Sequence, residues 1–436
     1  MSTELLTVLF FGSLVFFLFL GVSLAWVLGG ISVIFLYFTW GGDAFYMIAS
    51  RMWSTMNSFT LISVPLFILM AIILERSGVA LSLYRMMHLW WGGVRGGLAI
   101  GTVFICAIFG AMVGVSGAAV VTMGAVALPA MLARGYNREM ALGCINAGGG
   151  FGILIPPSIV MILYSMLTGV SVGALFAAGV MPGILLMILV SAYIAIRCFI
   201  NPSLGPSLPK EDRGSWKEKI VALKGVLLPI MIVALVLGSI LSGMATPTEA
   251  AAVGVLGSII SAAVHKQLTF KLISDASIKC LVLTSMIMWI LFSAYAFSTV
   301  YTSMGAQRVI MDIMASIPGG EWGVVFAMLV IVFLLGMVMD PVGIMMITLP
   351  VFVPLIQANG IDPIWFGIMF IIMMEIGYMT PPFGFNLFYL KGVAPKEITM
   401  LHIYKSVTPY VLVIILGMAL IAIYPEIATW LPKQVM

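Results

Sequence analysis

Long apolar runs separated by short polar segments dominate this chain, and their lengths predict a bundle of membrane-spanning helices. A spanning helix needs about 20 apolar residues. The first run, residues 5–40, is too long for one span and fits two spans joined near residues 21–23. The same measure predicts further spans near residues 57–74, 140–168, 174–198, 225–241, 248–264, 280–301, 363–390 and 406–428, with a polar arm over 265–279.

Two more apolar segments carry turn-forming residues at their centres and are predicted to be re-entrant helical hairpins. The first covers residues 96–133, with its expected tip at residues 116–117. A hairpin keeps Arg95 and Arg134 on one face of the membrane, whereas a single crossing would separate them. The second predicted hairpin covers residues 323–358.

Each half of the chain then has five spans and one hairpin, and an odd number of spans gives the two halves opposite orientations. The sequence therefore predicts an all-α polytopic membrane protein built as an inverted repeat. The first repeat is expected over residues 1–200 and the second over residues 225–436. Residues 201–224, the longest polar stretch, are expected to form a cytoplasmic linker.

One sequence element occurs twice, and the residue numbers of its two copies differ by a constant 225, without a gap. The matched positions are Pro129 with Pro354, Gly152 with Gly377, and residues 156–157 with residues 381–382. Each copy puts glycine and a proline pair inside an apolar span, which predicts broken helices over residues 138–168 and 362–390. Interrupted helices at corresponding positions of two halves indicate the binding site of a transporter.

Composition and charge support this interpretation. The chain is 62% hydrophobic and 8% charged, with a mean hydropathy of +1.20, which argues against a large soluble domain, an enzyme for soluble macromolecules or a nucleic-acid partner. With the N-terminus outside, 17 of the 20 basic residues fall on cytoplasmic segments, and the outer face keeps Arg51, Arg308 and Lys433. Both termini are therefore predicted to be periplasmic.

Polar groups near the hairpin tips and helix breaks predict two Na+ sites. Unpaired carbonyls at half-helix ends, together with hydroxyls and carboxylates, supply the oxygen ligands that a bare cation needs. The first site is expected from Ser116, Gly117, Gly150, Gly152 and Pro156. The second is expected from Asp340, Val342, Gly343, Gly377 and Thr380. Glycine at these positions also fits a simpler role, the close packing of helices.

A substrate anion is expected beside half-helix N-termini, because their partial positive charge favours it. The predicted substrate-binding residues are Asn146, Pro157, Ser158, Pro382 and Asn386. No arginine is placed for a bidentate carboxylate clamp, so weak binding by this chain alone is expected. For Glu375 two roles are open: a hydrogen-bonded structural carboxylate at the break, or a protonatable coupling group.

Several segments together make the chain similar to one known family. They are VPLFILMAIILERSG (64–78), GAMVGVSGAAVVTMGAVALPAMLARGY (110–136), GFGILIPPS (150–158), GMATPTEAAAVGV (243–255), MDPVGIMMITLPVFVPL (339–355) and MEIGYMTPPFGFNLF (374–388). Over essentially its full length the chain resembles the large permease, the DctM-type M subunit, of tripartite ATP-independent periplasmic (TRAP) transporters in the ion transporter superfamily.

The resemblance implies an elevator-type secondary transporter, not an enzyme, in a bacterial or archaeal inner membrane. It implies Na+ as the coupling ion, with no other cofactor, and import of a small organic acid anion. It also implies two partners, a separate small Q-type membrane subunit and a periplasmic substrate-binding protein. A stand-alone Na+/organic-anion symporter that needs no binding protein is the alternative. Which acid is carried stays open, because selection would rest largely with the binding protein.

Overall fold

The computed structural model describes residues 2–209 and 213–435, and within these ranges the regular elements are all helices. Eight of the described helices are long and apolar enough to cross a membrane. Large apolar side chains such as Phe19, Phe38 and Phe270 are more than four-fifths exposed on the outside of the bundle. In water such a surface would aggregate, whereas in a bilayer it faces lipid. The chain is an all-α polytopic membrane protein.

The first repeat begins with helices α1 to α5 and continues into a hairpin, a broken helix and α10. Its elements are α1 (Thr3–Phe19), α2 (Leu24–Trp40), η1 (Gly42–Ala44), α3 (Phe45–Met56), η2 (Phe59–Ile62), α4 (Ser63–Arg76), α5 (Val79–Trp91), α6 (Gly97–Val113), α7 (Ser116–Ala133), α8 (Arg138–Gly150), η3 (Phe151–Ile153), α9 (Ile159–Thr168) and α10 (Val172–Ile200). Helices α6 and α7 form the hairpin, and α8, η3 and α9 form the broken helix.

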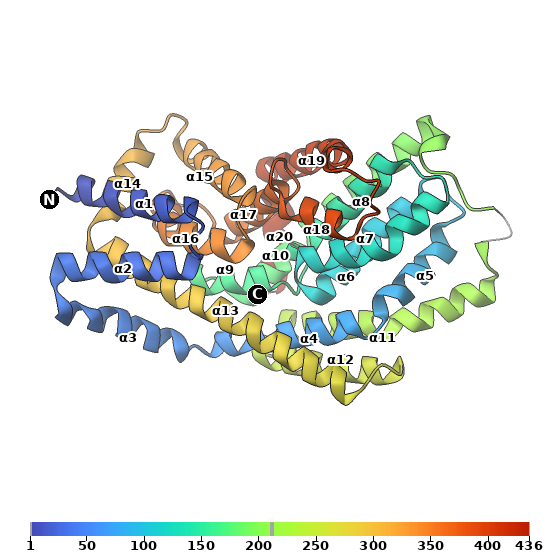
Figure 1. The fold of residues 1–436 in the computed structure, drawn as a ribbon, viewed down its shortest axis with the longest axis horizontal. Helices are drawn as coiled ribbons and strands as arrows, with labels where there is room; N and C mark the ends of the chain where they lie inside the picture. The colour runs from blue at the N-terminus through green and yellow to red at the C-terminus, as the bar shows by residue number, and fades with distance from the viewer. Residues whose placement is uncertain (1, 210–212, 436) are drawn as a thin grey trace.

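The second repeat follows the same order after the short helix η4 (Pro202–Leu204). Its elements are α11 (Trp216–Leu241), α12 (Pro247–Val264), α13 (Phe270–Ser303), α14 (Ala306–Ala315), α15 (Gly320–Gly336), α16 (Pro341–Ala358), α17 (Pro363–Tyr378), α18 (Phe385–Val393), α19 (Met400–Ile423) and α20 (Glu426–Val435). Figure 1 shows the hairpin α6–α7 and the hairpin α15–α16 on opposite sides of the molecule, with α9, α17 and α18 between them.

The constant offset between the two sequence copies is also present in the structure. Adding 225 to the bounds of α7, 116–133, gives 341–358, which are the bounds of α16. Adding 225 to the first residue of α8, 138, gives 363, where α17 begins. Both proline pairs, Pro156-Pro157 and Pro381-Pro382, are joined by cis peptide bonds. The two repeats therefore share their helix boundaries around the breaks.

The tip of the first hairpin differs from the expectation. The turn lies at Gly114 and Val115, and Ser116 and Gly117 already form the first turn of α7. Gly114 adopts the left-handed conformation, with φ of 68°, and its N–H donates to the carbonyl of Gly110. Glycine is the residue that ends helices in this way, because it has no Cβ to strain.

Several boundaries also differ from the expected ones. The linker expected over residues 201–224 ends at Ser215, where a capping box with Glu218 starts α11. The polar arm expected over residues 265–279 is not separate from its span, since α13 runs unbroken from Phe270 to Ser303. The second hairpin begins at Gly320, three residues early, and the second broken helix continues to Val393.

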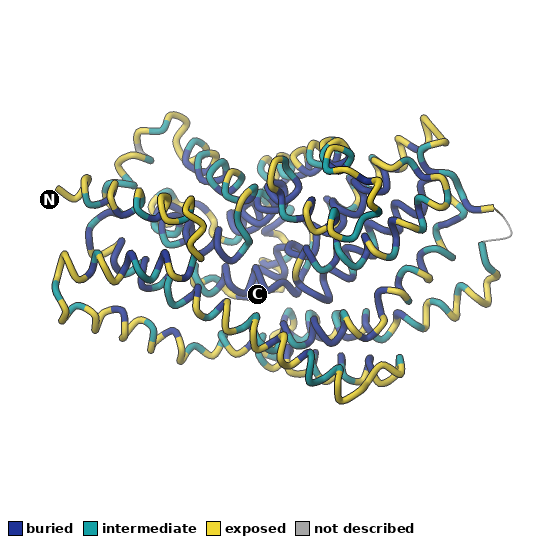
Figure 2. Tube along the Cα trace, viewed as in Figure 1, coloured by how far each residue is buried: buried dark blue, intermediate teal, exposed yellow. Residues whose placement is uncertain are grey.

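The short helices α3, α5, α14 and α20 were not expected. Each carries exposed polar or charged positions between its apolar ones, so none reads as a span of about 20 apolar residues. Helix α3 packs on α13 and α20 packs on α10, so tertiary contacts stabilise them. Figure 2 shows the exposed surface concentrated on the outer helices, while α8 and α17 are buried along most of their length.

Each hairpin crosses its own broken helix at a pair of glycines. In the first repeat, a Cβ added to Gly110 would lie 2.5 Å from the Cα of Gly152. In the second repeat, a Cβ added to Gly377 would lie 2.8 Å from the Cα of Gly336. At these two points backbone touches backbone, which any side chain would prevent.

A test of these crossings is the substitution Gly110→Ala. The added methyl group meets main chain, which cannot rotate away, so we expect a loss of about 1–3 kcal/mol of stability and a lower thermal unfolding midpoint in detergent. Gly12→Ala is the matched control, because nothing lies within 4 Å of a Cβ at that helical position. Equal midpoints for the two variants would contradict the crossing.

Candidate functional site

The two broken helices meet where α8 ends. Gly150, the last residue of α8, faces Glu375 of α17 so closely that a Cβ on Gly150 would lie 2.4 Å from a carboxylate oxygen. Glu375 is 0% exposed, and neither of its carboxylate oxygens has a hydrogen-bond partner among the described residues. One of the two roles considered for Glu375 is a structural carboxylate held by hydrogen bonds. The described residues provide no donor for it.

The tip of the first hairpin contacts the second repeat. Ser116 Oγ donates a hydrogen bond of 3.2 Å to Asn386 Oδ1, and both side chains are buried. A Cβ on Gly117 would lie 2.7 Å from the ring of Tyr389. The structure thus joins Ser116, expected in the first Na+ site, to Asn386, expected to bind substrate.

Helices α7 and α18 run parallel from this contact. Their first turns touch through Ser116 and Asn386, and farther along both helices Gly124 packs against Leu390. The N-termini of both helices therefore lie together. Neither the N-cap of α7, Val115, nor the N-cap of α18, Gly384, provides a side-chain capping hydrogen bond.

This pair of N-termini suits an anion. Uncapped N–H groups and two helix dipoles give partial positive charge in a buried place. The amide nitrogen of Asn386 has no hydrogen-bond partner within the described residues, so it can donate to a ligand. Ser116 adds a hydroxyl beside it.

The corresponding tip of the second repeat has the opposite character. Asp340 is the equivalent of Val115 under the offset between the repeats, and its carboxylate accepts from the N–H groups of Val342 (3.1 Å) and Gly343 (3.3 Å). A carboxylate therefore caps the N-terminus of α16 and offsets its partial positive charge. This end of the site can attract a cation and disfavours an anion.

The remaining residues of the second expected Na+ set lie near this tip. Gly377 touches Gly336 at the end of the hairpin's first arm. Thr380 Oγ1 donates to the carbonyl of Ile376 at 2.6 Å, which leaves its lone pairs available. The glycine crossing thus joins the second hairpin to the second break.

The residues of the first expected Na+ set have different neighbours in the structure. Gly152 lies against Gly110 and the carbonyl of Val115, beside the tip of its own hairpin. Gly150 instead faces Glu375, and Ser116 and Gly117 face α18. Pro156 is buried in the break.

Two predicted substrate-binding residues near the first break, Ser158 and Asn146, form hydrogen bonds with nearby backbone groups. Ser158 caps α9, accepting from the N–H of Met161, and its hydroxyl donates to the carbonyl of Ile153 at 2.7 Å. Asn146 donates to the carbonyl of Leu142, while its own side-chain oxygen has no partner in the described ranges.

The two breaks differ in exposure. Pro157 is buried, whereas its counterpart Pro382 is exposed and its carbonyl accepts a hydrogen bond of 2.7 Å from Tyr404 of α19. Two nearly identical motifs therefore have different surroundings, which the sequence alone did not predict.

Comparison with known proteins identifies the family of this chain. Residues 11–427 match the family described as "Tripartite ATP-independent periplasmic transporter, DctM component". This chain belongs to that family.

Individual relatives agree with this assignment of the permease. It is 36% identical to the C4-dicarboxylate TRAP transporter large permease of Vibrio cholerae, with 100% of this chain and 98% of the relative covered. It is 30% identical to the ectoine TRAP transporter large permease of Halomonas elongata, with 98% and 99% covered. It is 28% identical to the isethionate TRAP transporter permease DctMQ of Oleidesulfovibrio alaskensis, with 95% of this chain and 64% of the relative covered.

Among solved structures, the YdaH transporter of Alcanivorax borkumensis resembles the permease in fold. The TM-score is 0.62 at 12% sequence identity, with 94% of this chain and 97% of that chain covered. Its membership of the DctM family and its relatives place the chain among transporter components and not among enzymes.

Two tyrosines that the offset of 225 pairs, but that belong to none of the predicted site sets, join the repeats of the permease. Tyr164 OH donates to the carbonyl of Pro363 at 2.8 Å, from the first repeat to the second. Tyr389, its equivalent in the second copy, packs its ring on Gly117, from the second repeat to the first. The offset shared by the two tyrosines was the available signal, because it marks them as equivalent positions inside the repeated element.

A double-mutant cycle tests the contact between the broken helices of the permease. We expect Gly150→Ala to lower the unfolding midpoint, because its methyl group meets the carboxyl of Glu375. In a Glu375→Ala background the obstructing carboxyl is gone, so the same change should have little further effect. The expected coupling is about 1 kcal/mol or more, measured by unfolding in detergent. Additive effects of the two changes would contradict the contact.

Proposed function

We propose that this chain is the large permease subunit of a Na+-driven, binding-protein-dependent importer of a small organic acid anion, working by an elevator mechanism. The supporting observation is the pair of uncapped, parallel helix N-termini at Ser116 and Asn386, one from each repeat. They provide donors for an anion without an arginine. Relatives named for C4-dicarboxylate and ectoine transport support a small, polar substrate.

Sodium coupling is supported by the contrast between the two hairpin tips. Asp340 brings a carboxylate to the second tip, and carbonyls of the second break and Thr380 lie in the neighbouring segment. A cation at Asp340 and an anion at the N-termini of α7 and α18 would both be held by the hairpins and broken helices. Each net positive charge that crosses with the substrate gains about 2.3 kcal/mol per 100 mV, which drives import in the absence of an ATPase motif.

The contacts that join the hairpins and broken helices support an elevator mechanism. Two glycine crossings and the contacts of Ser116, Tyr164 and Gly150 with the second repeat tie these elements into one unit. Such a unit moves as a rigid body more readily than it deforms. The remaining helices would then form the scaffold.

Two partners are part of the proposal. The name DctMQ of one relative joins an M and a Q component, which supports a Q-type membrane partner for this chain. The family description names a tripartite periplasmic system, which supports a soluble binding protein in the periplasm. External capture would offset the weak anion binding expected without an arginine clamp.

The deciding experiment is uptake into proteoliposomes that hold this chain with its Q subunit. We expect accumulation only with an inward Na+ gradient and with the loaded binding protein outside. Uptake that needs Na+ but proceeds equally without the binding protein would instead identify a stand-alone symporter. Uptake without a Na+ gradient would overturn the proposal.

The role of Asp340 in Na+ binding can be separated from its role as a helix cap. Asp340→Asn keeps an oxygen that accepts from the N–H groups of α16 but removes the charge, so we expect normal stability and at least a tenfold higher Na+ concentration for half-maximal uptake. Asp362→Asn is the matched control, because Asp362 caps α17 in the same way, accepting from Ile364 and Trp365. Unchanged Na+ dependence in Asp340→Asn would remove Asp340 from the ion site.

The anion position is tested by Asn386→Asp. A carboxylate between the two helix N-termini repels a substrate carboxylate and takes up the N–H groups, so we expect a KM raised about tenfold or more, with little change in Na+ dependence. Asn359→Asp, at the end of α16, serves as control for charge alone. An unchanged KM in Asn386→Asp would place the anion elsewhere.

A further inference from the structure

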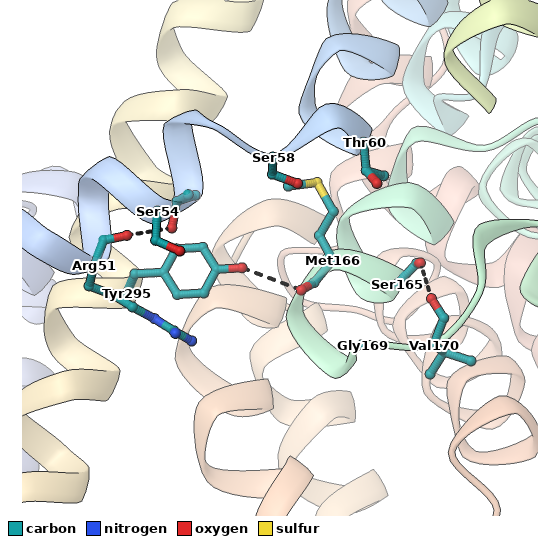
Figure 3. Close-up of a pocket in the computed structure, with 10 residues that line it drawn as sticks. Arg51, Ser54, Ser58, Thr60, Ser165, Met166, Gly169, Val170 and Tyr295 are labelled. Atoms are coloured by element: carbon teal, nitrogen blue, oxygen red, sulfur yellow. Dashed lines mark hydrogen bonds between the residues drawn. The ribbon is translucent and has the colours of Figure 1, made fainter. Parts of the chain in front are cut away.

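A pocket of about 320 Å³ lies where α3, α13 and the connection from α9 to α10 meet (Figure 3). Its lining residues are Arg51, Ser54, Thr55, Ser58, Thr60, Ser165, Met166, Gly169, Val170 and Tyr295. None of them belongs to the expected Na+ or substrate sets. By the predicted topology, these segments all lie toward the outer face.

Arg51 gives this outer pocket its charge. Its guanidinium carbon lies 5.2 Å from the centre of the Tyr295 ring, and Figure 3 shows the two side chains together. The ring orients the guanidinium but does not neutralise it. None of the lining residues is acidic, and Arg51 has no ion-pair partner in residues 2–209 and 213–435.

Hydroxyl groups add uncommitted donors. Thr55 and Ser165 already donate to the carbonyls of Arg51 and Val170. The hydroxyls of Ser54, Ser58 and Thr60, in contrast, form no hydrogen bond within the described part of the chain. The pocket thus combines one guanidinium with three free hydroxyls, a set of donors that matches the oxygens of a carboxylate.

We propose that the outer pocket is a second anion site, which binds a small carboxylate through Arg51 and the hydroxyls of Ser54, Ser58 and Thr60. A volume of about 320 Å³ admits an acid of a few carbons but not a folded partner. It also supplies the arginine that the helix breaks lack. The site at the breaks and the outer pocket therefore use different chemistry for the same class of ligand.

The outer pocket also bridges segments that the elevator mechanism would move apart. Its walls come from α3 and α13 on one side and from the end of α9 on the other, and Tyr295 OH donates to the carbonyl of Met166 at 3.3 Å across this boundary. An anion that contacts both walls stabilises the present arrangement of the two parts. This role in transport rests on the proposed function, whereas carboxylate binding at Arg51 does not.

Cysteine accessibility tests the site without knowledge of the transported acid. The four native cysteines are buried, so Val170→Cys adds one reactive thiol at the pocket and leaves the proposed donors in place. Purified protein is treated with anionic sulfonatoethyl or cationic trimethylammonioethyl methanethiosulfonate, with succinate or with chloride at equal ionic strength. We expect succinate to slow modification by the anionic reagent at least threefold, because bound succinate fills the pocket and offsets the charge of Arg51, and we expect Arg51→Gln to abolish this protection.

Arg308→Gln is the matched control, because Arg308 lies on the same predicted face outside the pocket and should leave protection intact. Arg51→Gln should also lower the ratio of anionic to cationic modification rates about fivefold or more. Two results would overturn the inference: equal protection of Val170→Cys with and without Arg51, or no protection of Val170→Cys when Arg51 is present. Protection by the binding protein but not by succinate would also overturn it and assign the pocket to docking. Sodium-driven uptake could persist in each of these cases, so failure here is distinct from failure of the proposed function.

Discussion

This structure depends on two close contacts between glycine backbones. Gly110 crosses Gly152 in the first repeat, and Gly336 crosses Gly377 in the second. A broken helix leaves backbone N–H and C=O groups without helical partners, and a bilayer offers no water to satisfy them. Such a break is stable only where protein surrounds it. The crossings bring each hairpin close enough to cover its break.

The repeats share their backbone but differ in charge. Position 115 is valine and its equivalent, position 340, is aspartate, so one helix N-terminus stays positive while the other is capped by a carboxylate. A pair of identical tips would offer the same environment to an anion and to a cation. The difference between valine and aspartate at this position gives the two equivalent tips opposite electrostatic character.

Much of the fold could be predicted because apolar length and the constant offset between the repeats are strong signals, and the bounds of α7 and α16 follow them. The amphipathic helices α3 and α14 were missed, since their stability comes from packing and not from an apolar run. The sequence indicated the hairpin tips and the helix breaks as parts of the site. Each predicted Na+ set combined a hairpin tip with the broken helix of the same repeat. The bond from Ser116 to Asn386 and the contact of Gly150 with Glu375 join different repeats, and pairing at that distance leaves no trace in one sequence.

The contacts between repeats have a consequence for biogenesis. Because the first half of the chain is made first, α7 and Gly150 enter the membrane before α17 and α18 exist to cover them. While the second half is being synthesised, the bare N-terminus of α7 and the small-residue surface of α8 have no native neighbour from that half. The first half therefore cannot complete its packing around α7 and Gly150 until α17 and α18 are in place.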